Sequence, residues 1–260
     1  MRSSFGAAFL AISGTCYVIL GVDFMLLLTT WPVTALLVAT DLRQSWLALV
    51  LVSPLLAPAG AAACTVFRGF WLDGSANVLS GFAKAWWRAR PTLLIGLAGA
   101  GLGGVLVVDA QFVATSPWGA LTLPPLAVVT VLAGLVFPYA LVAWSEYPGL
   151  KARHALRAAL LVAVRRWPSS LVSLAALTLL VGLFAVRPVL VALALPAPVL
   201  YIVWAGARRG LTSLRPDLPW LPQTHQAGPV PVVSPAGTRT VVPRPGGASL
   251  ALSPGSAQTR

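Results

Sequence analysis

The chain has 260 residues, of which 58% are apolar and 9% charged, with a mean hydropathy of +0.85 and a net charge of +12. Soluble domains carry about 25% charged residues, so this composition excludes an ordinary soluble fold and indicates an all-α, polytopic helical membrane protein. The basic residues lie in short clusters between apolar spans, where bilayer physics accounts for them, and we therefore expect no nucleic-acid partner. Cys16 and Cys64 both lie in apolar runs and supply neither a disulfide framework nor a zinc site.

The first apolar run begins after Arg2 and continues well past the length of a signal-peptide core, so we predict a retained membrane helix over residues 9–31. Asp23 lies within this helix, and a charge near the bilayer centre costs about 2.5–3.5 kcal/mol. The carboxyl group is therefore paired, protonated, or nearer the interface than this span places it. It is also the group on which we expect any chemistry of this chain to depend.

About six membrane spans are predicted in a helical domain covering residues 1–210. Prolines inside the second, fourth and sixth spans predict kinks, among them Pro54 and Pro138. Asp109 and Glu146 lie at the ends of the third and fourth spans, where we expect solvated carboxylates. The predicted spans are residues 9–31, 46–67, 92–108, 121–144, 169–186 and 189–207.

The third span is rich in small residues at a spacing of four. This spacing allows two membrane helices to approach closely, and we predict that these residues form a packing face. The residues concerned are Gly96, Gly99, Ala100, Gly103 and Gly104.

Two basic stretches that each contain tryptophan predict amphipathic helices on the cytoplasmic face, one in residues 73–90 and one in residues 151–167. In the first stretch Val78, Phe82 and Trp86 recur at helical spacing. Indole rings and cations suit the headgroup region, although such a helix can instead pack under the bundle, and both alternatives stay open. The predicted interface anchors are Trp86, Trp87, Arg88, Arg90, Arg165, Arg166 and Trp167.

The two basic stretches are each closed by a proline, Pro91 and Pro168, 77 residues apart. Aligning the prolines predicts a weak internal repeat, in which a span, a surface helix and a proline-initiated span occur twice. His154, in the second stretch, has several cationic neighbours, and we interpret it as a solvated surface residue rather than a ligand.

The distribution of charge predicts the orientation of the chain in the membrane. Of the 18 Lys and Arg residues, 16 fall on one side when the N-terminus, both basic stretches and the tail share that side, and only Arg43 and Arg187 fall opposite. This side is expected to be the cytoplasm. Residues 211–260 are rich in Pro, Gly and Ser, and we predict a disordered cytoplasmic tail.

Several segments resemble the YesL-like membrane proteins, a family catalogued as domain of unknown function 624. They are residues 31–34 (WPVT), 58–63 (PAGAAA) with Phe67 and Arg68, 82–86 (FAKAW), 137–141 (FPYAL) and 155–161 (ALRAALL). The resemblance covers residues 15–210 and departs from the family's pattern in extra residues before Pro58 and in the long tail. It implies a bacterial inner-membrane protein of uncharacterised activity, often encoded near carbohydrate-uptake genes, and it brings no catalytic residues.

Three functions follow as hypotheses. The first is an accessory or assembly partner of a carbohydrate-uptake complex with an ABC-type permease, based on the surface helices and the family's gene neighbourhood. The alternative is a small-solute transporter in its own right, based on Asp23, Asp109 and Glu146, the kinking prolines and the repeat. An intramembrane enzyme ranks last because neither a Ser/His pair nor a metal-ligand cluster occurs in the spans, so we expect no enzymatic activity and no cofactor.

Overall fold

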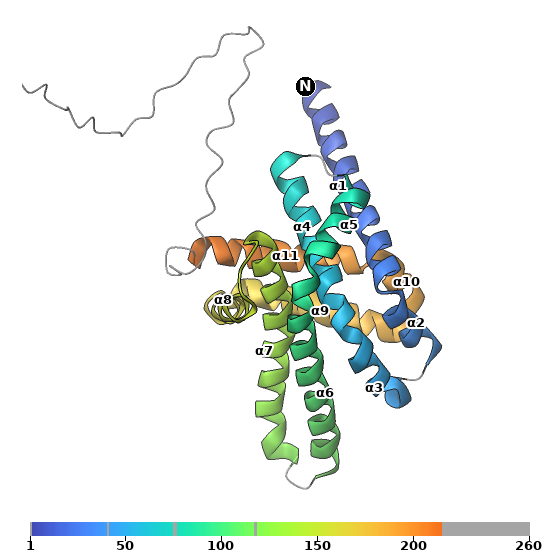
Figure 1. Ribbon diagram of the computed structural model, residues 1–260, viewed down its shortest axis with the longest axis vertical. Coiled ribbons are helices and arrows are strands. Elements are labelled where there is room, and N and C mark those ends of the chain that lie inside the picture. The colour runs from blue at the N-terminus through green and yellow to red at the C-terminus, as the bar shows by residue number, and fades with distance from the viewer. Residues whose placement is uncertain (1, 41, 75–76, 117–118, 215–260) are drawn as a thin grey trace, which may run out of the picture. The chain divides into compact units, whose positions relative to one another are not determined.

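The computed structural model describes residues 2–40, 42–74, 77–116 and 119–214, and among these residues the fold is all-α, without strands (Figure 1). The prediction of a disordered tail over residues 211–260 is wrong for residues 211–214, which continue the last helix, and the rest of the tail lies outside the described residues. The helices are α1 (Arg2–Thr29), α2 (Trp31–Ala39), α3 (Leu42–Val52), α4 (Leu56–Asp73), α5 (Val78–Arg88), α6 (Leu93–Thr115), α7 (Gly119–Glu146), α8 (Ala152–Arg165), α9 (Trp167–Val186), α10 (Pro188–Ala194) and α11 (Pro196–Leu214), with 3-10 turns η1 (Ser53–Leu55) and η2 (Arg90–Thr92).

Apolar helices of membrane-spanning length confirm the predicted class of polytopic membrane protein. Four described helical segments are long and apolar enough to cross a bilayer, and up to six spans result if each of two bent pairs counts as one. The pair α1–α2 bends by 74° and the pair α10–α11 by 53°. The four continuous spans are Ser45–Asp73, Arg90–Thr115, Gly119–Glu146 and Trp167–Phe184.

The helices depart from the predicted spans at several ends. Pro54 lies in the 3-10 turn η1, which joins α3 to α4 where the sequence predicts a kink. The third span was expected to end at residue 108, but α6 continues to Thr115 because the residues after Asp109 remain largely apolar. The sixth span was expected to end before Arg208, yet α11 runs through it to Leu214.

The core is built largely from small residues, which bring helices close together. Helix α4 contributes a continuous buried run over residues 57–64, and α8 buries Ala155, Ala158 and Ala159 against α7 and α11. A buried hydrogen bond crosses from α7 to α9, where the Tyr139 hydroxyl donates to Ser173 Oγ at 3.0 Å. Without a hydrophobic driving force between helices in lipid, such close packing and interhelical bonds hold the bundle together.

The predicted packing face of α6 contacts three different elements. A Cβ atom at Gly96 would lie 2.7 Å from the carbonyl oxygen of Pro54, so only glycine permits this approach of α6 to η1. A Cβ atom at Gly99 would lie 3.1 Å from the Phe137 ring on α7, and one at Gly104 would lie 3.4 Å from a side chain on α3. Gly96, Gly99 and Gly104 therefore fit α6 between α7 and the α3–η1 segment, whereas Gly103, predicted to pack, has no neighbour within 4 Å of a Cβ position.

The amphipathic helix α5 packs against the bundle with its apolar face. Asn77 caps it by accepting a hydrogen bond from Ser80 N at 3.4 Å, and Val78 and Phe82 are each 1% exposed. Lys84 and the C-terminal Arg88 lie on the exposed side. Helix α5 thus uses one face for packing under the bundle and leaves a basic face free for the headgroup region.

Candidate functional site

An apolar cavity of about 790 Å³ lies between both bent helix pairs and helices α3, α4, α6, α7 and α9. Its lining contains no charged side chain among the described residues. The four hydroxyl groups in the lining each donate a hydrogen bond to a backbone carbonyl within the same helical segment or one adjoining it. They belong to Thr30, Thr34, Ser53 and Thr130.

The cavity opens sideways, between membrane spans. Leu56, Val107, Thr130 and Gly134 line it and are also exposed at the protein surface. All four positions lie inside the segments that are long and apolar enough to cross a bilayer. These positions would face lipid hydrocarbon once the segments cross a bilayer.

A charged cluster joins the ends of three helices. Glu146 at the end of α7 lies between Arg68 on α4 and Arg208 on α11, and each guanidinium Nε is 3.7 Å from Glu146 Oε2. The indole nitrogen of Trp204 donates to Glu146 Oε1 at 3.1 Å, and Arg68 also donates to the Ser145 carbonyl at 3.1 Å. We call Arg68, Glu146, Trp204 and Arg208 the Glu146 clamp.

Aromatic rings lie beside the clamp. The Arg208 guanidinium lies 5.1 Å from the ring centroid of Trp204 and 5.5 Å from that of Trp71, within range of cation–π attraction. Phe67 packs edge-on against Tyr201, with 5.3 Å between ring centroids. Of the two indole rings beside Arg208, Trp204 is buried and Trp71 is 63% exposed, so water reaches the clamp from the side of Trp71.

The expectation that Glu146 is solvated is wrong, because its side chain is only 12% exposed. The sequence analysis did not identify the partners Arg68 and Arg208, of which Arg208 directly follows the predicted sixth span. One signal was available, since Trp204 and Arg208 lie four residues apart on a helix, and Glu146 is the only glutamate of the chain.

The cavity and the clamp lie on the same three helices. Gly60 on α4, Leu141 on α7 and Leu200 on α11 line the cavity, whereas the clamp residues lie four to eight positions further along, about 6–12 Å by helical rise. The residues between the cavity and the Glu146 clamp form a buried, closely packed layer. This layer includes Cys64, Phe67, Val142, Ala143 and Val203, each 1% exposed or less.

Asp23 lies on α1, on another side of the cavity, and its side chain is 3% exposed. One carboxyl oxygen, Oδ1, accepts a hydrogen bond at 2.7 Å from the backbone N–H of Ala197, at the start of α11. Of the alternatives that the sequence left open, a partner is present, and this partner is a backbone donor. The other oxygen, Oδ2, is buried and has no hydrogen-bond partner among the described residues.

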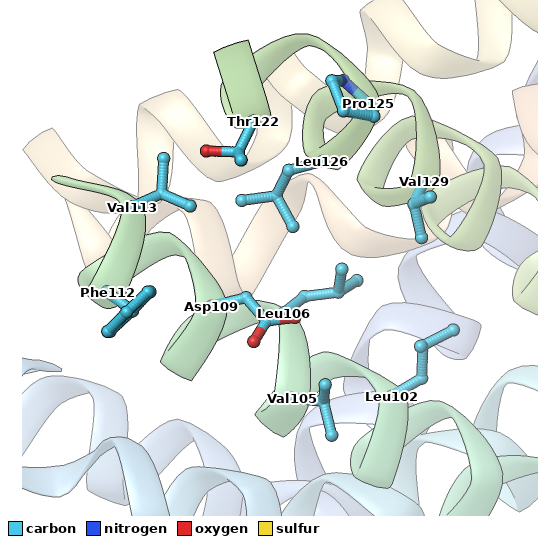
Figure 2. A pocket seen from close by; sticks show the side chains of 10 residues that line it. All are labelled: Leu102, Val105, Leu106, Asp109, Phe112, Val113, Thr122, Pro125, Leu126 and Val129. Carbon is cyan, nitrogen blue, oxygen red and sulfur yellow. The ribbon is translucent and has the colours of Figure 1, made fainter. Parts of the chain in front are cut away.

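Asp109 lies in a separate groove of about 410 Å³ between α6 and α7, whose lining contains neither Asp23 nor a residue of the Glu146 clamp. Figure 2 shows its carboxylate beside Leu106, in a groove whose other labelled walls include Phe112 and Leu126. Asp109 itself is exposed. The three candidate acidic residues thus occupy three different environments and do not form one site.

The predicted interface anchors lie mainly on the surface. Trp86 is half-buried against the core, whereas Trp87 is 58% exposed and stacks under the Arg90 guanidinium, 3.4 Å from the ring centroid. The remaining anchors are also exposed: Arg88, Arg165, Arg166 and Trp167. Exposed rings beside cations are the arrangement that the headgroup region favours.

His154 lies on α8, and its side chain is partly exposed. Partial burial, and then the charges of Arg153, Arg157 and Lys151, lower the pKa of His154 from its ordinary value of 6.5. The imidazole is therefore held in its neutral form more strongly than a free histidine would be. No other group on the surface helices offers comparable sensitivity near neutral pH.

Comparisons with known proteins leave the family open. No family model, curated protein or solved structure matches this chain. The resemblance to the YesL-like proteins and the expected absence of enzymatic activity therefore stay predictions. Within the described part of the chain, no group of three or more potential metal ligands comes together.

Proposed function

We propose that this protein binds an apolar or single-chain amphipathic molecule within the membrane, and that an acyl chain occupies the cavity between the two bent helix pairs. The observation that supports this proposal best is the lateral opening, which lies between membrane spans at Leu56, Val107, Thr130 and Gly134. A molecule dissolved in the bilayer reaches such an opening without crossing water. The volume of about 790 Å³ lies within the usual range of ligand sites.

The polar groups of the lining argue against a sugar as the occupant. Every hydroxyl in the lining donates its proton to a backbone carbonyl, as with Thr30 to Leu26 and Ser53 to Val50. A carbohydrate would leave most of its own hydroxyl groups unpaired there, at about 1–3 kcal/mol for each buried group. If this chain serves carbohydrate uptake, we infer that it does so without holding the sugar in this cavity.

Two glycines of α6 provide a matched test. Gly103 lines the cavity and Gly101 does not, and a Cβ atom at either would meet nothing within 4 Å. We expect Gly103→Phe to fill the cavity and Gly101→Phe to point to lipid. Membranes of the producing cells are loaded with a diazirine-bearing fatty acid and illuminated, and the labelled protein is quantified.

The proposal predicts that Gly103→Phe lowers the labelling of α4 and α7 peptides by at least about tenfold, equivalent to roughly 1.4 kcal/mol of binding, while Gly101→Phe labels like the wild type. Equal labelling of both variants would contradict an acyl chain in the cavity. Comparable thermal unfolding of the two variants excludes misfolding as the reason for a difference.

For localisation, we propose a bacterial inner membrane with both termini in the cytoplasm. The exposed cations of α5 and α8, together with the predicted basic tail, support this orientation. In a Cys16→Ser background, Asn77→Cys should resist an impermeant thiol reagent in intact cells and Ser116→Cys should react. The reverse pattern of labelling would overturn this orientation.

A second candidate function is an accessory subunit of a larger membrane complex, plausible in carbohydrate uptake from the resemblance stated above. The supporting observation is the low burial of two spans: only 6% of the best window of Arg90–Thr115 and 11% of that of Trp167–Phe184 lie inside the protein. Membrane helices associate by packing, so spans this exposed leave room for helices of another chain.

Purification of the tagged protein in mild detergent from its own membranes tests this second function. Stoichiometric permease or ATPase subunits identified by mass spectrometry would support an accessory role and indicate the transported class. A solitary protein that still takes the fatty-acid label would contradict it and leave the binding function standing.

A further inference from the structure

Asp23 lies where the two bent helix pairs meet. Helix α1 bends into α2 just after Thr29, and α10 bends into α11 at Leu195. Helices α1 and α2 both contact α10, and α1 also contacts α11. A broken helix exposes backbone groups that need partners inside a membrane, and such breaks occur where they line a cavity or an ion site.

The sequence at the start of α11 leaves one backbone donor for Asp23. Pro196 and Pro198 have no N–H group, so Ala197 carries the only backbone N–H in the first three residues of the helix. That N–H donates to Asp23 Oδ1 at 2.7 Å. The carboxyl group therefore closes the free end of α11, and its second oxygen remains buried without a partner.

No full positive charge balances this carboxyl group among the described residues. The helices packed against α1 are α2, α4, α5, α10 and α11, and α2 and α10 contain no ionisable side chain. Arg208 on α11 is held by Glu146, eleven residues from Ala197 and about 16 Å away by helical rise. The ionisable side chains on the remaining packed helices are Cys64, Arg68 and Asp73 on α4, Lys84 and Arg88 on α5, and Tyr201, Arg208 and Arg209 on α11.

We propose that Asp23 is a proton-binding site at the junction of the bent helices, and that its carboxyl group carries the proton on Oδ2 in the conformation seen here. An isolated buried carboxylate is far more costly than a buried neutral acid, and a helix N-terminus supplies only about half a charge. Release breaks the O–H bond, leaves the electron pair on Oδ2 and passes the proton to water that reaches the junction. This inference does not depend on what occupies the cavity.

Infrared spectroscopy of the purified protein tests the proposal directly. At neutral pH the wild type should show a protonated-carboxyl C=O band that shifts in heavy water, and Asp23→Asn should remove it completely. Asn retains an oxygen that accepts the Ala197 N–H, so the junction stays capped. Asp109→Asn, at an exposed carboxylate, is the matched control and should leave the band unchanged.

Two results would overturn the proposal. One is the absence at neutral pH of any band that Asp23→Asn removes, which would mean that Asp23 is ionised. The other is a band that disappears when sodium replaces choline at constant ionic strength and pH, which would make a metal cation the preferred ligand of this site.

A second measurement covers the case in which Asp23→Asn does not fold. The chain has five aspartates, so replacing Asp41, Asp73, Asp109 and Asp217 with Asn leaves Asp23 as the only one. With carboxyl-labelled aspartate, the carbon-13 chemical shift should be that of a neutral acid at neutral pH. A shift typical of a carboxylate would contradict the proposal.

Discussion

Glu146 and Asp23, the two most buried acidic side chains among the described residues, are held in opposite ways. Glu146 has two guanidinium partners and an indole donor and lies at the end of its helix. Asp23 has one backbone donor and lies within a helix, beside the break between α10 and α11. In this fold, a buried carboxylate can be balanced by arginine, as at Glu146. A buried carboxyl group without a cationic partner, such as Asp23, is stabilised in another way, for which we propose protonation.

The largest expected effect tests the clamp side of this comparison. Glu146→Gln leaves Arg68 and Arg208 without a counter-charge, and removing one partner of a buried ion pair costs about 3 kcal/mol or more. Thermal unfolding in detergent should show a strongly lowered midpoint. Asp109→Asn, which removes an exposed carboxylate, should leave the midpoint nearly unchanged, and an equal loss in both variants would contradict the clamp.

A double-mutant cycle sharpens the same point. Replacing Arg208 with Gln should destabilise the wild type more than it destabilises the Glu146→Gln variant, by a coupling energy of about 2 kcal/mol. The same free-energy measurements supply all four corners of the cycle. Additive effects would mean that the 3.7 Å approach of Arg208 to Glu146 contributes nothing to stability.

A smaller effect is expected at Asp23. Asp23→Ala removes the acceptor for the Ala197 N–H, and losing such a cap costs about 1 kcal/mol, whereas Asp23→Asn keeps the acceptor and should cost less. Measuring the free energy of unfolding of both variants tests whether Asp23→Ala is the more destabilising. If Asn and Ala were equally damaging, the hydrogen bond to α11 would not be the main role of Asp23 in stability.

The smallest effect concerns a titratable group outside both acidic sites. Because the pKa of His154 is lowered in the folded state, protonation favours the unfolded chain, so stability should fall slightly as the pH drops through 6.5 and below. His154→Gln should remove this part of the pH dependence and leave stability at higher pH unchanged. A pH profile identical to that of the wild type would contradict the lowered pKa.

Composition and periodicity were sufficient to predict the class of fold, and some prolines lie where helices break, whereas Pro138 lies inside the continuous helix α7. Pro54 falls in η1, and the sixth span divides at Pro196, as fixed φ and the missing N–H require. The small residues Gly96 and Gly99 were also recognisable, because close helix packing needs a missing side chain at fixed spacing.

The contacts of the charged residues could not be predicted in the same way. Glu146 was expected in solvent because it ends a span, and only the tertiary approach of α4 and α11 brings Arg68 and Arg208 to it. The partner of Asp23 is a backbone N–H far along the chain, which no side-chain pattern reveals. The cavity likewise depends on how several helices fail to fill the space between them.

The position of the fatty-acid label within the protein tests the central proposal most directly. After illumination, peptide mapping should place the diazirine adducts on the cavity wall, around Gly60, Phe137, Leu141 and Leu200, at a density above that of the outer surface. Adducts confined to outward-facing residues of α6 and α9, such as Leu94 and Leu171, with none on the wall, would show that the acyl chain stays outside and would contradict the account.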